Sequence, residues 1–242
     1  MSSTSETGDA VNLINFQTLV SRCTGYGTRY NPTNTRIQVA SMETIGDNVV
    51  AAIQTITTTK PAWDNAINIR QTIFADMVKL STRVINAFDA TENVTEKQVD
   101  DARTVIRKIR GERKSKKIDN PSSDDPIQIS ASQRSFANQM LHFLELVGIL
   151  SAEPTYNPNE TELQVAQLQT YQNTMGDAMD AVINAQNPYL AALATRNNLM
   201  YAPTTGLVDV ALEAKKYVKS VSSISKEEYN QISGIKFSRK KL

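Results

Sequence analysis

The sequence is poor in the residues that most catalytic, metal-binding and disulfide sites require. Among 242 residues there is one Cys, one His and one Trp. Cys23 alone cannot form an intramolecular disulfide, which excludes a disulfide framework and suits a reducing compartment. Cys23 and His142 lie in different halves, so they do not form a local zinc cluster. Gly-rich phosphate loops and nucleophile elbows are also missing. We therefore expect no metal, no cofactor and no enzymatic activity.

Glycine, proline and aromatic residues are scarce, with 9 Gly, 8 Pro and 6 % aromatics. Gly and Pro interrupt helices, whereas Ala, Gln, Leu, Met and Lys favour them, so the composition is typical of a helical protein. No stretch shows the sustained two-residue alternation of a β-strand. We therefore expect an all-α fold.

Long apolar runs and a strong net charge are absent as well. No window approaches the roughly 18 consecutive apolar residues of a transmembrane helix. The N-terminal residues lack the basic and apolar regions of a Sec signal peptide, so we expect a cytoplasmic protein, with signal-independent export left open. A net charge of +1 provides no global field that would attract nucleic acid.

What the sequence does contain is an internal repeat. Residues 30–45 return as residues 156–171, with eight of sixteen positions identical at a shift of 126 residues. Such self-similarity indicates a duplicated structural unit. We predict two tandem four-helix units related by this duplication, with long antiparallel helices. The expected boundaries are a disordered tail at 1–9, a first helical repeat at 10–117, a linker at 118–131, a second helical repeat at 132–235 and a basic tail at 236–242.

Asparagine–proline pairs and capping residues predict where helices begin. Asn31-Pro32 and Asn157-Pro158 have the order of an N-cap followed by a first helical proline, so each pair is expected to open a helix. Thr95 and Ser225 each precede a Gln or Glu by three residues, which is the spacing of a capping box.

Proline and glycine positions also predict where helices end. Turns are expected at 57–61 and at 187–188. A helix break is expected at 202–206, where only the second half has a Pro and a Gly. Beyond this point the halves align at a shift of 112 rather than 126, which predicts an extra loop of about fourteen residues near 88–98.

Two arginines interrupt the apolar faces of their helices. Arg70 and Arg196 match at the shift of 126, and both fall on a stripe with steps of three and four. A guanidinium there must find a carboxylate or helix-end carbonyl groups, or reach out to solvent. We predict that both arginines form structural polar contacts that set the register of the helices. Snorkelling into solvent is the alternative.

A basic segment is the second candidate site. Residues 103–117 hold eight basic groups against one acidic group. The candidate contact patch consists of Arg107, Lys108, Arg110, Arg113, Lys114, Lys116 and Lys117. Such a patch is typical of contacts with nucleic acid or an anionic membrane. The alternative is compensation of a helix dipole at a C-terminus. Little aromatic interleaving argues against binding of single strands, so nucleic acid is disfavoured.

Three segments resemble a group of uncharacterised all-helical bacterial proteins with an internal duplication. They are residues 156–158, residues 205–210 with 215–219, and residues 231–234. The resemblance extends over most of the chain and implies an all-helical fold. It implies no catalytic residue, cofactor or activity.

These observations favour a structural function. We expect a non-enzymatic protein that self-assembles into an oligomer or filament, or that scaffolds a protein partner, because two equivalent halves present related surfaces. A second copy of the chain is the expected partner. The alternative is the soluble form of a helical pore-forming or membrane-active protein, and only under that reading is a membrane a partner.

Overall fold

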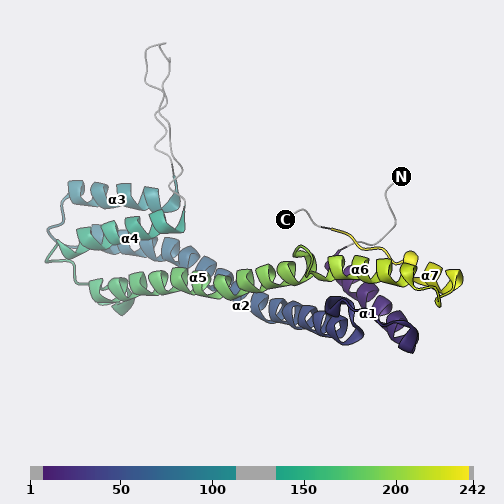
Figure 1. The fold of residues 1–242 in the computed structure, drawn as a ribbon. Coiled ribbons are helices and arrows are strands. Elements are labelled where there is room, and N and C mark those ends of the chain that lie inside the picture. The colour runs from purple at the N-terminus through teal and green to yellow at the C-terminus, as the bar shows by residue number, and fades with distance from the viewer. Residues whose placement is uncertain (1–7, 113–134, 240–242) are drawn as a thin grey trace, which may run out of the picture. The chain divides into compact units, whose positions relative to one another are not determined.

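The computed structural model describes residues 8–112 and 135–239. Within these ranges every regular element is helical and there is no β-strand, which confirms the all-α fold for this part of the chain. The expected linker and the ends of both expected tails lie outside the described residues. The helices are α1 Asp9–Gly25, α2 Val39–Asp89, α3 Glu96–Arg110, α4 Phe136–Ser151, α5 Val165–Tyr201, α6 Leu207–Ser220 and α7 Lys226–Ser233 (Figure 1).

The two longest helices run straight through both expected turns, so the turn predictions are wrong. α2 has 51 residues with Pro61 inside it, and α5 has 37 residues with Pro188 inside it. A helical proline removes one backbone hydrogen bond, but the packing of a helix outweighs such local preferences when buried residues lie on both sides of the proline. In α2, Ala52 and Ala66 are buried on either side of Pro61. The threonines before it keep their hydroxyls inside the helix, as in the 2.9 Å bond from Thr55 to the carbonyl of Ala51.

The Asn-Pro pairs do not open helices, so the predicted N-caps at Asn31 and Asn157 are wrong. α2 begins only at Val39 and α5 only at Val165. Each pair is followed by a bend and a short 3₁₀ turn, Thr35–Ile37 in the first case and Thr161–Leu163 in the second.

The reason is a tyrosine hydroxyl that the capping rule does not consider. Tyr30 donates to the carbonyl of Ile37 at 2.6 Å, and Tyr156 donates to the carbonyl of Leu163 at 2.9 Å. All four residues are buried. Each bond satisfies a phenol inside the core and holds the chain in a turn before the helix starts. Both repeated segments therefore have the same local structure.

Several helix boundaries follow the sequence closely. The capping boxes at Thr95 and Ser225 are present, and they open α3 and α7. The break at 202–206 is confirmed between α5 and α6. Gly206 is required there by close approach, because a Cβ on it would lie 2.6 Å from the backbone nitrogen of Ala202.

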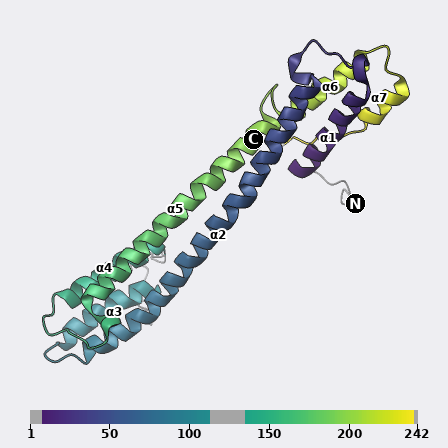
Figure 2. The same ribbon diagram turned by 90° about the horizontal axis from the view of Figure 1, so that it is seen from below.

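The chain forms two compact units. The first unit comprises residues 1–62 and 185–242, and it contains α1, α6, α7, the first part of α2 and the last part of α5. The second unit comprises residues 63–184, with the last part of α2, α3, α4 and the first part of α5. These units differ from the expected repeats at 10–117 and 132–235. Each combines the N-terminal part of one expected repeat with the C-terminal part of the other. In Figure 2, where colour follows residue number, each unit therefore contains colours from both halves of the chain.

α1 and α4 contribute matching buried positions to the cores of their units. α1 in the first unit and α4 in the second unit bury the same positions at a shift of 127 residues. The matched buried pairs are Phe16 with Phe143, Leu19 with Leu146, Val20 with Val147 and Cys23 with Leu150. α1 packs on α6, and α4 packs on α3, so each of these helices finds its partner in the other half of the sequence.

Candidate interaction sites

Arg196 occupies a polar cluster in the first unit. Its Nη1 atom lies 2.9 Å from a carboxylate oxygen of Asp9 in the first turn of α1. The two side chains are only 17 % and 13 % exposed. Asp9 also accepts a short hydrogen bond from the hydroxyl of Tyr201. Burial and this bond to Asp9 raise the pKa of Tyr201 to about 12, so the phenol stays protonated and remains a donor. Asp9 is thus a helical residue with partners, although the sequence placed it in a disordered tail.

Arg70 meets an aromatic ring in the second unit instead of a carboxylate. Its guanidinium carbon lies 4.4 Å from the centre of the Phe136 ring, within the range of a cation–π contact. Phe74 packs edge-on against the same ring, with 4.7 Å between the ring centres. The Nε atom of Arg70 is buried and has no hydrogen-bond partner among residues 8–112 and 135–239. The structure therefore gives this guanidinium an aromatic contact, and gives its Nε atom no acceptor in the described ranges.

The two arginines contact corresponding positions. Asp9 begins α1 and Phe136 begins α4, and these positions match at the same shift of 127 that aligns the cores. In each unit, an arginine from one half of the sequence thus reaches the first residue of a helix from the other half. The sequence identified the two arginines but not their partners. Asp9 lies more than a hundred residues from Arg196, and Phe136 carries no charge.

A second polar cluster holds the C-terminal segment, which we define as residues 233–239. Asn12 on α1 is 1 % exposed. Its amide nitrogen donates to the carbonyl of Ser238 at 2.8 Å, and its oxygen accepts from the backbone nitrogen of Ser238 at 2.9 Å. One turn further along, Asn15 donates to the carbonyl of Lys236 at 2.7 Å. Sequence reasoning missed both asparagines, since no local pattern marks a contact this distant.

α6 holds the same segment from another side. The ammonium group of Lys215 donates to the carbonyls of Ser233 and Ile235, at 2.9 and 2.8 Å. Partial burial lowers the pKa of Lys215. Ile235 and Phe237 pack against the core of the first unit. The expected basic tail is therefore docked on the protein through residue 239, as far as the structure describes it.

The described part of the basic patch has local partners. Arg107, Lys108 and Arg110 all fall in the last turn of α3. Lys108 lies 3.4 Å from the carboxylate of Glu145, and Arg110 donates to the hydroxyl of Thr82 at 2.7 Å. Cations at this end of a helix are favoured by its dipole. Arg113, Lys114, Lys116 and Lys117 lie outside the described residues.

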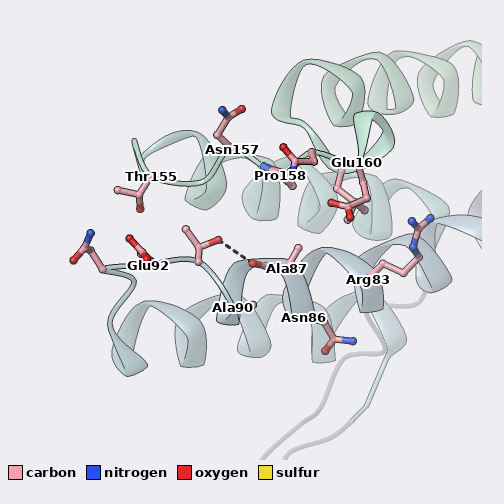
Figure 3. Close-up of a pocket in the computed structure, with 13 residues that line it drawn as sticks. Arg83, Asn86, Ala87, Ala90, Glu92, Thr155, Asn157, Pro158 and Glu160 are labelled. Carbon is pink, nitrogen blue, oxygen red and sulfur yellow. Dashed lines mark hydrogen bonds between the residues drawn. The ribbon is translucent and has the colours of Figure 1, made fainter.

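A groove of about 900 Å³ opens in the second unit, lined by both polar and apolar residues (Figure 3). It lies between the end of α2 and the segment that leads into α5, and one of its lining residues, Arg83, pairs with Glu162 at 2.7 Å. Amide side chains are common along it, namely Asn86, Asn93, Asn157 and Asn159. Nothing in the sequence pattern pointed to this groove.

Exposed apolar residues recur at one matched position. Ile14 on α1 is 61 % exposed, and Leu141 on α4 is 57 % exposed. The two positions match at the shift of 127 residues. Leu144, 47 % exposed, lies one turn after Leu141. The first and fourth helices therefore share both a buried face and an outward apolar position.

The single cysteine and the single histidine lie in separate environments. Cys23 is fully buried, and burial raises the pKa of its thiol to about 11, which makes it a poor nucleophile. His142 lies 3.4 Å from Glu145 on the same helix. In the ranges that the structure describes, no group of three His, Cys, Asp or Glu side chains is arranged to hold a metal ion. No helix in these ranges is long and apolar enough to cross a membrane.

Comparisons with protein-family models, with curated proteins and with solved structures found no match. The resemblance to uncharacterised helical bacterial proteins therefore stays a prediction.

Proposed function

We propose that the chain is a non-enzymatic structural or interaction protein that self-assembles into an oligomer or filament, or scaffolds a partner. We further propose that its two halves arose by duplication of one helical unit. The observation that supports this function most is the outward apolar position that α1 and α4 share. A duplicated contact point gives each chain two related surfaces, which is a direct route to extended or closed assemblies.

The energetics favour covering these side chains. Removing a Leu or Ile side chain from water contributes about 1.5–3 kcal/mol when burial is complete. One such contact is weak, but two on the same chain act together once a first contact has formed. We therefore expect oligomers whose mean size increases with protein concentration, rather than a single stable dimer.

Light scattering after size exclusion, together with negative-stain microscopy, tests this proposal. We expect the mean mass of the wild-type chain to rise with concentration. Ile14→Lys and Leu141→Lys should each reduce the mean mass, and the double variant should reduce it further. Ile69→Lys is the matched control, since Ile69 is 48 % exposed on α2 but its counterpart in the second half is Thr195. A strict monomer over a wide concentration range would contradict self-assembly.

A further inference from the structure

The C-terminal segment is held mainly through its backbone. Three side chains on α1 and α6 direct five hydrogen bonds to backbone atoms of Ser233, Ile235, Lys236 and Ser238, and the donors and acceptors are Asn12, Asn15 and Lys215. Two side chains of the segment, Ile235 and Phe237, supply its apolar contacts. This combination of backbone bonds and alternate apolar anchors is how proteins commonly bind an extended peptide.

The sequence of the segment suits it to leave and rebind as a unit. Gly234 follows the last residue of α7, and residues 235–239 of the segment lie beyond it. Beyond Gly234 only residues 235–239 of the described chain must move, and all of their contacts noted above are made to α1, α6 and the core of the first unit. Every one of those contacts could be made equally well by the same segment of another copy. Exchange of an identical element between copies is a low-cost route to association.

We propose that the surface formed by α1 and α6 is a peptide-docking site whose second occupant is the C-terminal segment of another copy of this chain. This inference rests on the proposed self-assembly and names a contact that carries it. Within one chain the segment is held at an effective concentration in the millimolar range, so the intramolecular form prevails in dilute solution. Docking of the segment of another copy competes with this intramolecular form as the protein concentration approaches the millimolar range.

A peptide titration tests the docking site directly. The probe is a labelled peptide with the sequence of residues 233–239, and the receptor is the full-length Phe237→Asp chain, whose own segment has lost an anchor. We expect saturable binding by fluorescence anisotropy. Adding Asn12→Ala should weaken binding at least tenfold, because it removes both bonds to Ser238. Asn15→Ala should weaken it less. Binding that is absent, or that Asn12→Ala leaves unchanged, would overturn the proposal.

Gln139→Ala provides the matched control for this titration. Gln139 occupies on α4 the position that Asn12 occupies on α1, and it donates to the carbonyl of Ile109 at 3.0 Å in the second unit. Its loss should leave peptide binding unchanged while removing a comparable helix side chain. Weakening as large as that from Asn12→Ala would show a general loss of stability and would overturn the assignment.

Mixing two full-length variants tests exchange between copies. The Asn12→Ala chain keeps its segment, and the Phe237→Asp chain keeps its docking surface. Each alone should assemble less than the wild type, and an equimolar mixture should regain mass by light scattering. If the wild type assembles and both variants assemble as well as it does, the docking proposal fails while the proposed function stands. If the wild type stays monomeric but the peptide binds, self-assembly fails and the docking site stands.

Discussion

Arg196 in the first unit pairs with Asp9, whereas Arg70 in the second unit lies over the ring of Phe136. Both contacts join a long helix to the first residue of a helix from the other half of the sequence. A carboxylate and an aromatic face are alternative ways to hold a half-buried cation. The comparison shows that the position of the contact is common to the two units while its chemistry differs.

The two units also differ in which further elements supply residues to their cores. α2 continues fourteen residues beyond the point that matches the end of α5, as their lengths of 51 and 37 residues show. This extension brings Met77, Val84 and Phe88 into the core of the second unit. In the first unit, α7 and the C-terminal segment supply Ile232, Ile235 and Phe237 to the core. The extra fourteen residues predicted from the alignment are therefore helix rather than loop.

The largest expected effect is on the matched core phenylalanines. Phe16→Ala in the first unit and Phe143→Ala in the second unit should each lower the free energy of unfolding by about 3–5 kcal/mol, because both rings are fully buried. Chemical denaturation followed by circular dichroism measures this. Leu141→Ala should change the stability by no more than about 0.5 kcal/mol, as it is exposed. A cost below about 1 kcal/mol for only one of the two phenylalanines would break the equivalence of α1 and α4.

The next effect separates the two arginines. Arg196→Met leaves the poorly exposed carboxylate of Asp9 without its cation, and it should cost about 1–3 kcal/mol or more. Arg70→Met removes a cation–π contact together with a buried nitrogen that lacks a partner among the described residues, so it should change stability by less than about 1 kcal/mol. Thermal melts of both variants at one pH compare them. Equal losses in both would show that the difference in partners has no energetic meaning.

A smaller effect is expected at the helix caps, one of which lies in each unit. Ser225→Ala and Thr95→Ala each remove a side-chain acceptor at the start of a short helix. Each should cost about 1 kcal/mol. Replacement by Asp restores an acceptor at the same position and should recover most of the loss in urea denaturation. No recovery would indicate that these hydroxyls act through some other contact.

The smallest effect concerns acid stability. Arg29 holds the pKa of Glu228 in the first unit at about 2, below the ordinary value of 4.5, and Arg83 lowers the pKa of Glu162 in the second unit. A carboxylate with a lowered pKa stabilises the fold above its ordinary pKa, and this contribution is lost as the pH falls from about 4.5 towards 2.

Denaturation between pH 7 and pH 3 tests this dependence. In the Arg29→Met variant the free energy of unfolding should fall less steeply as the pH is lowered, because the pKa of Glu228 then returns towards its ordinary value. Arg83→Met should reduce this pH dependence less, since Glu162 is more exposed than Glu228. If the free energy of unfolding depends on pH in the same way in the wild type and the Arg29→Met variant, this pair contributes nothing measurable, as is common for exposed ion pairs.

Local features of the fold could be predicted, because local rules decide them. The capping boxes at Thr95 and Ser225 and the break before Gly206 depend on neighbouring residues alone. The continuation of α2 through Pro61 could not be predicted, because tertiary packing outweighs the local preference of proline. The turns after Tyr30 and Tyr156 depend on buried hydroxyl bonds that a capping rule omits.

The candidate sites were harder to predict, because their contacts are distant in sequence. Arg70 and Arg196 could be found as polar residues on an apolar stripe. Their partners could not, since Phe136 is uncharged and Asp9 lies in what reads as a polar terminus. Asn12 and Ser238 are 226 residues apart, and neither has a distinctive neighbourhood. A pattern with a short period carries no information about such pairs.

The discontinuous composition of the first unit has a consequence for synthesis on the ribosome. Residues 63–184 of the second unit are contiguous, so that unit can close as soon as they emerge. α1 emerges before the other helices that the structure describes, whereas α6 and the C-terminal segment that cover it emerge long after it. At 5–20 residues per second the wait is roughly 10–40 s. For that interval the buried side chains Phe16 and Leu19 have only the first part of α2 to pack against, and α6 completes their cover last.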